Sequence, residues 1–330
     1  MDVYHASLKE AQADPRLVAQ ACGSPFERLE WLALLADECL DPAKARVTVA
    51  VDGNIAALLP WREASGQVAA LANWYNFFVK PGGDASLFAG LVKALPYGRA
   101  MFAPMAHGDA QMLAAAFRKA GWIVLSDPCD SNHVLPLNGR SFAEYWAARP
   151  GALRETVRRK GRKGDVALRI ATEFSEADWA AYEAVYNLSW KPGEGSPDFL
   201  RKWAQMDGAA GRLRLGIAEI GGEPVATQFW TVEGGTAFIH KLAHDERYRK
   251  QSPGTLLTAA MFEHVIDRDR IGMVDFGTGD DPYKRDWMEA VRTRYRLRAW
   301  KPSAVRHWPS LVRATARHLL QPLVSANHDG

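Results

Sequence analysis

The chain has 330 residues, which exceeds what one hydrophobic core usually holds and predicts two domains. Hydrophobic residues make up 48% of the sequence and charged residues 24%, which excludes a disordered or collagen-like chain. The net charge is only +3, from 41 basic and 38 acidic residues, so the overall charge does not favour nucleic acid as a partner.

Cysteine usage and hydropathy predict a reduced cytoplasmic protein. The three cysteines, Cys22, Cys39 and Cys129, are odd in number and lack C-x-x-C spacing, which argues against a disulfide framework and a structural zinc site. Residues 1–16 lack the basic start and apolar run of a secretory signal. No stretch of about 18 uncharged apolar residues is present to span a bilayer. We therefore expect a cytoplasmic location, no membrane span and no metal.

The first half of the sequence alternates helical and extended patterns. Asp52 and Gly53 between two apolar runs are typical of a β-hairpin, because both residues accept positive φ. We predict helices over residues 8–21, 25–40, 87–95 and 109–120, and strands over residues 46–51, 55–61, 67–79, 99–105 and 122–127.

A basic segment marks the predicted domain boundary. Seven basic residues lie between Arg149 and Lys163, with Glu155 as the only acidic residue there. Helical spacing would place Arg154, Arg158 and Arg162 on one stripe. This basic arm, residues 146–165, is either a solvated linker helix or a face for a phosphorylated or acidic acceptor. We predict an N-terminal domain over residues 1–145 and a C-terminal domain over residues 146–330.

The second half repeats the order of elements of the first. We predict strands over residues 166–172, 213–220, 224–232, 237–243 and 273–276, and helices over residues 176–188, 197–206 and 254–269. An irregular segment then leads to residues 292–300. Two helices, a three-strand meander, a helix and a strand thus occur once in each half, which suggests a duplicated architecture. The predicted fold class is α/β (α+β), with mixed central sheets flanked by helices.

Residues 249–255 form the most informative segment. A predicted strand leads into a turn, and Ser252, Pro253 and Gly254 open the next helix. Free N–H groups and the positive end of the helix dipole make such a start a site for a diphosphate, although the same residues also suit a simple helix cap. The spacing Arg-x-x-Ser-x-Gly resembles the Arg/Gln-x-x-Gly-x-Gly/Ala loop with which the GNAT acyltransferase superfamily holds coenzyme A. Ser252 departs from it, since glycine is usual there.

Further sequence motifs in the second half of the chain extend this resemblance. The chain resembles bacterial FemAB-like tandem-GNAT acetyltransferases of the cellulose-biosynthesis CelD type, over about residues 145–300 in motif and over the whole chain in layout. The motifs are Ser189-Trp190-Lys191-Pro192, Gln228-Phe229-Trp230, Ile239-His240-Lys241-Leu242, Ser252-Pro253-Gly254-Thr255, Val274-Asp275-Phe276-Gly277 and Asp280-Asp281-Pro282-Tyr283-Lys284. A role in exopolysaccharide or cell-envelope synthesis follows from this analogy alone.

The resemblance implies an acyl-CoA site in the C-terminal domain and a non-catalytic N-terminal domain. The fourth strand would splay from the fifth, backbone groups at Leu242 and Ala243 would hold the pantetheine arm, and one of them would donate to the oxyanion. Tyr283 would protonate the leaving thiolate. The loop residues expected to bind the cofactor are Arg249, Lys250, Ser252, Gly254 and Thr255.

Residues 277–285 follow a predicted strand and combine charge with permissive backbone, as functional loops do. Asp280 or Asp281 would accept a proton from an incoming amine or fix its ammonium group; the alternative is a surface turn that opens a short helix at Pro282. Lys284 would meet a phosphate or carboxylate, although a solvated lysine is the commoner case.

His240 is a further candidate, as a general base or a substrate-orienting residue. His240 and His244 lie four apart at a strand end and would share one face if the strand stays regular. Lys241 and the extended element do not fit a zinc-binding H-E-x-x-H helix. The alternative is a histidine that is hydrogen-bonded within the sheet.

Four more residues are candidates for the substrate wall: Trp190, Lys191, Gln228 and Trp230. Tryptophan often lines pockets, but it is also a large core residue, and the core is the first reading for Trp190 and Trp230.

We therefore predict transfer of an acetyl or other acyl group from acyl-CoA, directly in a ternary complex, to a small-molecule acceptor such as a sugar or amino acid. Two alternatives stay open: a Fem-type transferase that uses aminoacyl-tRNA, and an inactive module that binds polyanions. A methyltransferase reading of residues 274–279 fails because too little chain follows for a nucleotide-binding unit. The sequence leaves open the acceptor, the acyl-chain length, N- or O-transfer, the pathway and the oligomeric state.

Overall fold

A computed structural model describes residues 1–18 and 22–320, and the chain divides into two compact units. Unit 1 comprises Met1–Ala21, Phe26–Asp130 and Thr293–Gly330, and unit 2 comprises Cys22–Pro25 and Ser131–Arg292. The last three residues of the helix predicted over residues 8–21 lie outside the described residues. In the part of the chain that the structure describes, no helix combines the length and apolar character needed to cross a bilayer.

Two long strands pass from one unit to the other along the chain. Strand β7 (Ile123–Pro136) begins in unit 1 and ends in unit 2, and β13 (Ala290–Trp300) begins in unit 2 and ends in unit 1. In unit 1, β13 pairs antiparallel with β6 (Arg99–Met105). The C-terminal residues therefore belong to unit 1, whereas a single boundary at residue 145 assigns them to the second domain.

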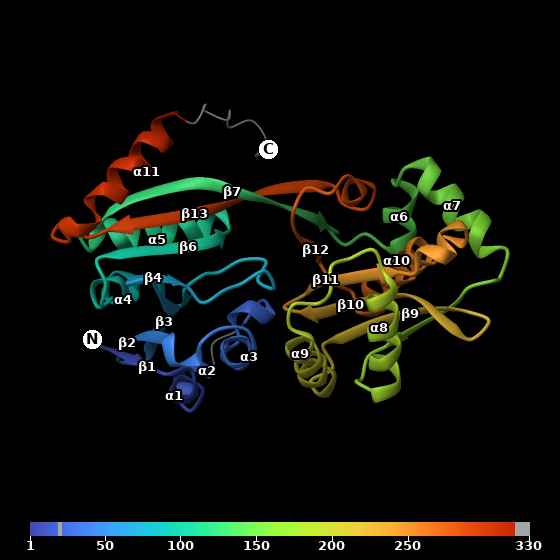
Figure 1. The fold of residues 1–330 in the computed structure, drawn as a ribbon, viewed down its shortest axis with the longest axis horizontal. Coiled ribbons are helices and arrows are strands. Elements are labelled where there is room, and N and C mark those ends of the chain that lie inside the picture. Colours follow the sequence, from blue (N-terminus) through green and yellow to red (C-terminus); the bar gives the residue numbers. More distant parts are fainter. Residues whose placement is uncertain (19–21, 321–330) are drawn as a thin grey trace. The chain divides into compact units, whose positions relative to one another are not determined.

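Unit 1 is a mixed sheet with helices (Figure 1). Its strands follow the order β1-β2-β3-β4-β6-β13-β7, with β5 paired to β3. Helices α4 and α5 bury their apolar side chains, among them Phe88, Leu91 and Phe117, against this sheet. The elements not yet given are β1 (Asp2–Ala6), α1 (Leu8–Gln12), α2 (Pro15–Val18), α3 (Leu29–Cys39), β2 (Ala45–Asp52), β3 (Ile55–Ala64), β4 (Gln67–Ala70), β5 (Gly82–Gly83), α4 (Phe88–Lys93), α5 (His107–Lys119) and α11 (Trp308–Leu320).

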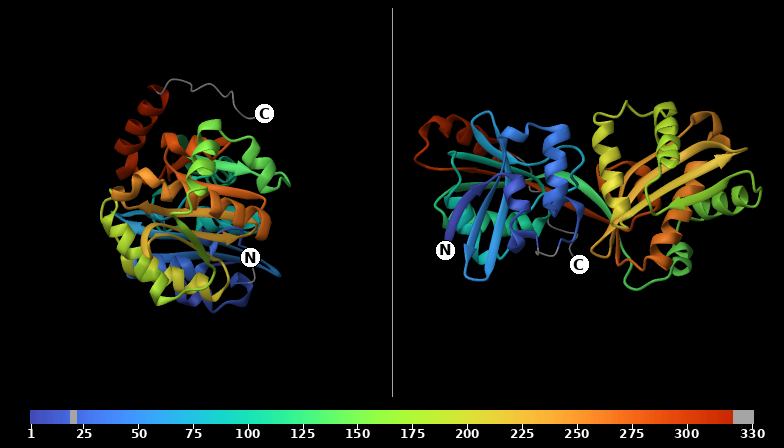
Figure 2. Two further views of the ribbon diagram at one scale, coloured as in Figure 1. Left: turned by 90° about the vertical axis from the view of Figure 1, so that its right-hand side faces the viewer. Right: turned by 90° about the horizontal axis from the view of Figure 1, so that it is seen from below.

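The strands of unit 2 pair into a mixed sheet in the order β7-β12-β11-β10-β9-β8. Helices α8 and α9 cover one face of this sheet, and α10 covers the other (Figure 2). Its elements are α6 (Phe142–Ala147), α7 (Gly151–Gly161), β8 (Ala167–Ala171), α8 (Glu176–Leu188), α9 (Pro197–Ala209), β9 (Leu213–Ile220), β10 (Glu223–Glu233), β11 (Thr236–His244), α10 (Pro253–Glu263), a π-helical turn (His264–Arg268) and β12 (Met273–Thr278).

The two units repeat one topology, as predicted. In unit 1 an antiparallel meander, β2-β3-β4, is followed by α4 and then by β6, which pairs parallel with β4. In unit 2 the meander β9-β10-β11 is followed by α10 and then by β12, which pairs parallel with β11. The predicted α/β fold class, with a mixed sheet flanked by helices in each half of the chain, is confirmed.

Several element boundaries differ from the predicted ones for local physical reasons. The hairpin at Gly53 is confirmed, with Asp52 opposite Ile55. Strand β4 ends at Ala70 instead of residue 79, because Asn73 accepts a hydrogen bond from the Tyr75 N–H group and forms a turn. Strands β1 and β13 and helix α11 were not among the predicted elements.

Strand β7 continues to Pro136, although a strand was predicted only over residues 122–127. Its later residues are rich in Asp, Ser and Asn, which is typical of a turn. These polar side chains instead find distant partners: Asp127 pairs with Arg298, and Asn132 donates to Asp275 at 2.7 Å. Long-range hydrogen bonding therefore overrides the local turn signal.

Candidate functional site

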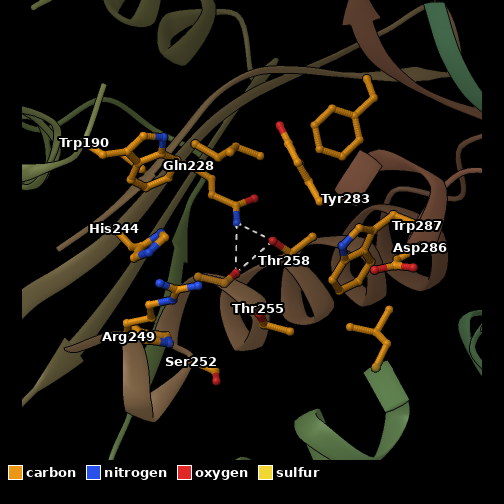
Figure 3. Close-up of a pocket in the computed structure, with 16 residues that line it drawn as sticks. Trp190, Gln228, His244, Arg249, Ser252, Thr255, Thr258, Tyr283, Asp286 and Trp287 are labelled. Atoms are coloured by element: carbon orange, nitrogen blue, oxygen red, sulfur yellow. Dashed lines mark hydrogen bonds between the residues drawn. The ribbon is translucent and has the colours of Figure 1, made fainter. Parts of the chain in front are cut away.

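A pocket of about 490 Å³ lies in unit 2 between the end of β11, the start of α10 and the segment that follows β12 (Figure 3). It is lined by Leu153, Trp190, Gln228, Leu242, Ala243, His244, Arg249, Ser252, Pro253, Gly254, Thr255, Thr258, Phe276, Tyr283, Asp286 and Trp287.

The pocket opens where two parallel strands separate. The pairing of β11 with β12 runs only from Thr236 to Phe238 on β11 and from Met273 to Asp275 on β12. Beyond Phe238, β11 keeps its pairing with β10 on its other side, up to His244. Alternate backbone groups of the last β11 residues therefore face the side from which β12 has departed. Backbone donors and acceptors near Leu242 and Ala243 line this opening, as predicted for a splayed strand pair.

A β-bulge in β11 decides which side chains face the pocket. Phe229 pairs with Lys241 and Trp230 pairs with Ile239, so His240 is the extra residue. The bulge shifts the alternation by one position, and Ile239 and Leu242, three apart, both pack on the α10 face. Leu242 and His244 consequently line the pocket.

His240 does not line the pocket, because the bulge directs it to the opposite face. Its ring lies 4.3 Å from the ring of Trp203 in α9, and its Nε2 atom lies 2.7 Å from the Thr231 hydroxyl. This matches the alternative interpretation, a histidine that is hydrogen-bonded within the sheet. Lys241 faces the same way and forms an ion pair with Glu194 at 2.6 Å.

Helix α10 begins at the pocket with its first turn open. Ser252 adopts left-handed backbone angles, φ 57° and ψ 43°, and its side chain forms no capping hydrogen bond. Left-handed angles favour glycine, which explains why glycine is usual at this position in the loop that the sequence resembles. The first bond of the helix is from the Leu256 N–H group to the Ser252 carbonyl at 3.1 Å. The N–H groups of Gly254 and Thr255 precede it and have no acceptor within the helix.

Gln228 ties this helix start to the sheet. Its amide nitrogen donates to the Thr258 hydroxyl at 2.6 Å and to the Gly254 carbonyl at 3.3 Å (Figure 3). Trp230 donates from its indole N–H group to the Gln228 amide oxygen at 3.0 Å. Trp230 is fully buried, so it supports Gln228 from the core and is not part of the substrate wall. Gln228 lines the pocket, and these bonds fix its orientation.

Basic and aromatic side chains form the wall near the helix start. Arg249 lines the pocket and lies beside His244 (Figure 3). The His244 ring lies 4.5 Å from the Trp190 ring, and its Nε2 atom lies 3.0 Å from a Glu246 carboxylate oxygen. Partial burial lowers the pKa of His244 below its usual value, although Glu246 opposes this shift. Lys250 is exposed and does not line the pocket, and its carbonyl accepts a hydrogen bond from the Lys160 ammonium.

Tyr283 and Trp287 lie on the side of the pocket opposite His244 and Arg249 (Figure 3). The Tyr283 ring contacts the Phe276 ring edge-on, with 5.6 Å between centroids. Burial, followed by the negative charge of Asp281, raises the pKa of Tyr283 to about 12. The phenol therefore keeps its proton throughout the neutral range and can act as a hydrogen-bond donor.

The charged residues beside Tyr283 hold the loop and do not enter the pocket. Asp280 accepts from His133 at 2.8 Å and from Arg285 at 2.8 Å, which lowers its pKa. Lys284 is buried and donates to the carbonyls of Thr278 and Gly279 at 2.6 and 3.1 Å. Lys284 thus clamps the loop, contrary to its predicted contact with substrate.

Nine predicted site residues therefore meet in one pocket and seven do not. Those that line it are Trp190, Gln228, Leu242, Ala243, Arg249, Ser252, Gly254, Thr255 and Tyr283. Those outside it are Lys191, Trp230, His240, Lys250, Asp280, Asp281 and Lys284.

The sequence analysis did not identify Thr258, Asp286 and Trp287 as pocket residues. Helical spacing offered a signal for Thr258, because it follows Gly254 by four positions and shares its face. Asp286 and Trp287 end a short 3-10 helix, Pro282–Asp286, in a segment without regular periodicity. Among residues 1–18 and 22–320, no three His, Cys, Asp or Glu side chains converge to form a candidate metal site.

A comparison with protein families finds a match within the second unit. Residues 151–285 match the model of the acetyltransferase (GNAT) domain. This range contains β11, α10 and β12, and it covers every residue that lines the pocket except Asp286 and Trp287. The match confirms the predicted GNAT resemblance for this part of the chain. No curated protein sequence matches the chain.

Solved structures similar to this chain share its two-unit fold. FemX superimposes with a TM-score of 0.63 at 10% identity, covering 94% of this chain and 99% of FemX. L-PGS from Bacillus licheniformis superimposes with a TM-score of 0.59 at 15% sequence identity, covering 94% of this chain and 95% of L-PGS. A C-terminal domain (DUF2156) from Agrobacterium fabrum, assigned to a lysylphosphatidylglycerol synthetase, superimposes with a TM-score of 0.60 at 13% sequence identity. The alignment covers 94% of this chain and 95% of that domain. At these identities the similarity concerns the fold alone.

Proposed function

We propose that the chain transfers an acyl group, with acetyl as the expected one, from acyl-CoA to an amine or hydroxyl acceptor. One observation carries the proposal: the uncapped start of α10 and the open edge of β11 line the same pocket. The GNAT domain match over residues 151–285 supports the same class of reaction. A link to exopolysaccharide or cell-envelope synthesis, and the CelD type in particular, is a proposal that rests on sequence resemblance alone.

In this proposal the coenzyme binds from the helix start to the strand edge. The N–H groups of Gly254 and Thr255, together with the positive end of the α10 dipole, would bind the diphosphate, with Arg249 beside it. Backbone groups at Leu242 and Ala243 would pair with the amide groups of the pantetheine arm. The pocket volume of about 490 Å³ falls within the usual range for small-molecule sites.

The proposed chemistry needs an oxyanion donor and an acid. The acceptor nitrogen or oxygen attacks the thioester carbonyl carbon, the carbon–sulfur bond breaks, and the thiolate leaves with the bonding electrons. A backbone N–H group at the open β11 edge would stabilise the developing oxyanion. Tyr283 would donate a proton to the thiolate. The acceptor would release its proton to solvent, and the Tyr283 phenolate would regain a proton from solvent.

A thiol-release assay with acetyl-CoA tests the proposal. Purified protein is incubated with acetyl-CoA and a panel of amines, sugars and amino acids, and binding of acetyl-CoA is measured separately by calorimetry. We expect saturable binding and acceptor-dependent release of thiol. If neither acetyl-CoA nor an acyl-CoA with a longer chain binds, acyl transfer from coenzyme A is ruled out.

A second candidate donor is aminoacyl-tRNA, as in the Fem-type enzymes. The observation that favours it is α7, whose Leu153 lines the pocket while Arg154, Arg158 and Arg159 are exposed. A polyanion could contact these side chains while its acyl end reaches the pocket. The fold similarity to FemX is consistent with this donor. Transfer from charged tRNA, without binding of acetyl-CoA, would favour the second candidate.

The third possibility, a module that binds polyanions without catalysis, gives a different result in the same experiments. Such a module would bind RNA or another polyanion with an affinity that falls steeply with salt. It would release no thiol and would transfer no aminoacyl group.

A further inference from the structure

Lys191 lies beside the pocket wall, in the segment that joins α8 to α9. Its ammonium group is 5.8 Å from the centre of the Trp190 ring, and Trp190 lines the pocket. The Lys191 side chain is partly buried. A positive charge is thus held close to the open strand pair, on a segment that does not contribute to the α10 helix start.

Other charged groups near Lys191 are already engaged. The ammonium group of Lys241 pairs with Glu194 at 2.6 Å. The ammonium group of Lys284 binds two backbone carbonyls and lies 3.9 Å from Asp281. Within the described ranges, no carboxylate lies at ion-pair distance from the Lys191 ammonium. Of these three lysines, Lys241 and Lys284 each have a carboxylate neighbour, whereas Lys191 has none at ion-pair distance within the described ranges.

Burial, and then the charge of Lys241, lowers the pKa of Lys191 to about 8. A cation in this position lacks full hydration and lies next to other cations, so an anion would stabilise its charged form. The coenzyme's diphosphate does not supply this anion in the proposed binding mode, because that group lies at the α10 start.

We infer that Lys191 binds an anionic group of the acceptor, a carboxylate or a phosphate. This inference rests on the proposed acyl transfer and names the acceptor class: a molecule that carries an amine or hydroxyl to be acylated and, on the same molecule, an anion. Amino acids and phosphorylated amino sugars have this combination. The bond to Lys191 would orient the nucleophile toward the gap between β11 and β12.

Matched acceptor pairs test the inference. Glycine is compared with glycinamide for the carboxylate, and glucosamine 6-phosphate with glucosamine for the phosphate. In the wild-type protein we expect the anionic member of at least one pair to have a kcat/KM about tenfold higher than the neutral member. The pair that shows this preference identifies which anion is bound.

Two variants separate the charge of Lys191 from its shape. Lys191→Met keeps most of the side-chain length and should reduce the preference for the anionic member to about onefold, whereas Lys191→Arg should retain most of it. A preference for neutral acceptors, or an anionic preference that Lys191→Met leaves unchanged, overturns the inference. Failure of the wild-type protein to bind acetyl-CoA is a separate outcome, because it overturns the proposed acyl transfer instead.

A labelling experiment decides the question independently of turnover. Reductive methylation of Lys191 is followed by mass spectrometry, with and without excess inorganic phosphate or acetate. An anion bound to Lys191 favours the ammonium form and should slow its methylation several-fold relative to Lys163, which is exposed on the segment after α7. Equal slowing of Lys191 and Lys163, or no slowing, counts against an anion site at Lys191.

Discussion

The two units follow the same path but differ at the helix that comes after the meander. In unit 1, Asp84 precedes the helical segment and its carboxylate accepts from the N–H group of Ser86 at 2.9 Å and from its hydroxyl at 2.6 Å. A short 3-10 turn, Ala85–Leu87, then leads into the six residues of α4. In unit 2, Ser252 forms no side-chain cap and α10 runs for 11 residues.

This difference shows what turns a helix start into an anion site. Asp84 provides unit 1 with its own negative charge, which satisfies a free N–H group and leaves less positive potential for a ligand. The start of α10 keeps both its N–H groups and its dipole available. The following strands differ as well: β6 enters α5 after one residue, Ala106, whereas β12 is followed by the loop that carries Tyr283. The topology alone therefore does not create the site.

The largest expected effect comes from filling the helix start. A Cβ atom at Gly254 would meet the His244 ring at 3.5 Å, an ordinary contact, so Gly254→Ala should fold and bind. The indole of Gly254→Trp would occupy the space beside His244 and the diphosphate site. We expect acetyl-CoA binding by Gly254→Trp to fall below detection in calorimetry, which corresponds to a loss of at least about 100-fold.

Gly108→Trp is the matched control in unit 1. It lies in the first turn of α5, and a Cβ atom there meets no atom within 4 Å. Acetyl-CoA binding by this variant should equal that of the wild-type protein. Equal binding by Gly254→Trp and Gly108→Trp would place the coenzyme elsewhere and remove the proposed contrast between the two helix starts.

Local signals allowed the fold and the helix start to be predicted from the sequence. Ser252, Pro253 and Gly254 are adjacent in the chain, and their cap and turn chemistry is independent of distant residues. The repeated order of helices and strands likewise follows from short periodic segments. This is why nine of the predicted site residues line one pocket.

The remaining site residues depended on contacts that no local pattern encodes. The position of His240 is set by a bulge in β11 that arises where this strand pairs with β10. Asp280 binds His133, which lies 147 positions earlier in the chain. Lys284 resembles a solvated lysine in the sequence, but the carbonyls of its own loop draw it into the interior. Tertiary context thus decided the positions of three residues that have the right chemistry for catalysis.

The second-largest effect concerns the loop that only unit 2 has after its parallel strand. Tyr283→Phe removes the proposed acid but keeps the ring against Phe276. We expect kcat to fall by about 100-fold, while the Kd of acetyl-CoA changes by less than about twofold. Steady-state kinetics and calorimetry measure the two effects separately. Tyr248→Phe, outside the pocket, is the control, since its hydroxyl binds Glu223 at 2.8 Å. An unaltered kcat for Tyr283→Phe would exclude the phenol as the acid.

A smaller effect is expected when a carboxylate, like that of Asp84 in unit 1, is introduced at the start of α10 in unit 2. Ser252→Asp places a carboxylate at the start of α10, as Asp84 does before α4, and Ser252→Asn is its neutral counterpart of similar shape. Both side chains tolerate left-handed backbone angles. We expect the Kd of acetyl-CoA to be about tenfold higher for Ser252→Asp than for Ser252→Asn, because the carboxylate competes with the diphosphate for the helix start. Identical Kd values would mean that this helix start does not bind an anion.

The smallest expected effect is a difference between the two helix starts in the pH range over which a nearby titratable group changes the free energy of unfolding. The pKa of His244 is lowered chiefly by burial, so between this lowered value and about 6.5 the unfolded chain binds more protons than the folded one. The free energy of unfolding should therefore fall as the pH drops through about 6.5, and His244→Gln should weaken that dependence.

Asp84 should act in a different pH range. Hydrogen bonds from Ser86 lower its pKa, so its contribution is present above about pH 3.9 and is lost only as the pH falls below that value, through the lowered pKa. Urea unfolding across this pH range, with His244→Gln and Asp84→Asn compared, measures both slopes. If His244→Gln also altered the slope below about pH 4, or if Asp84→Asn altered it near pH 6.5, the charges at the two helix starts would not act independently.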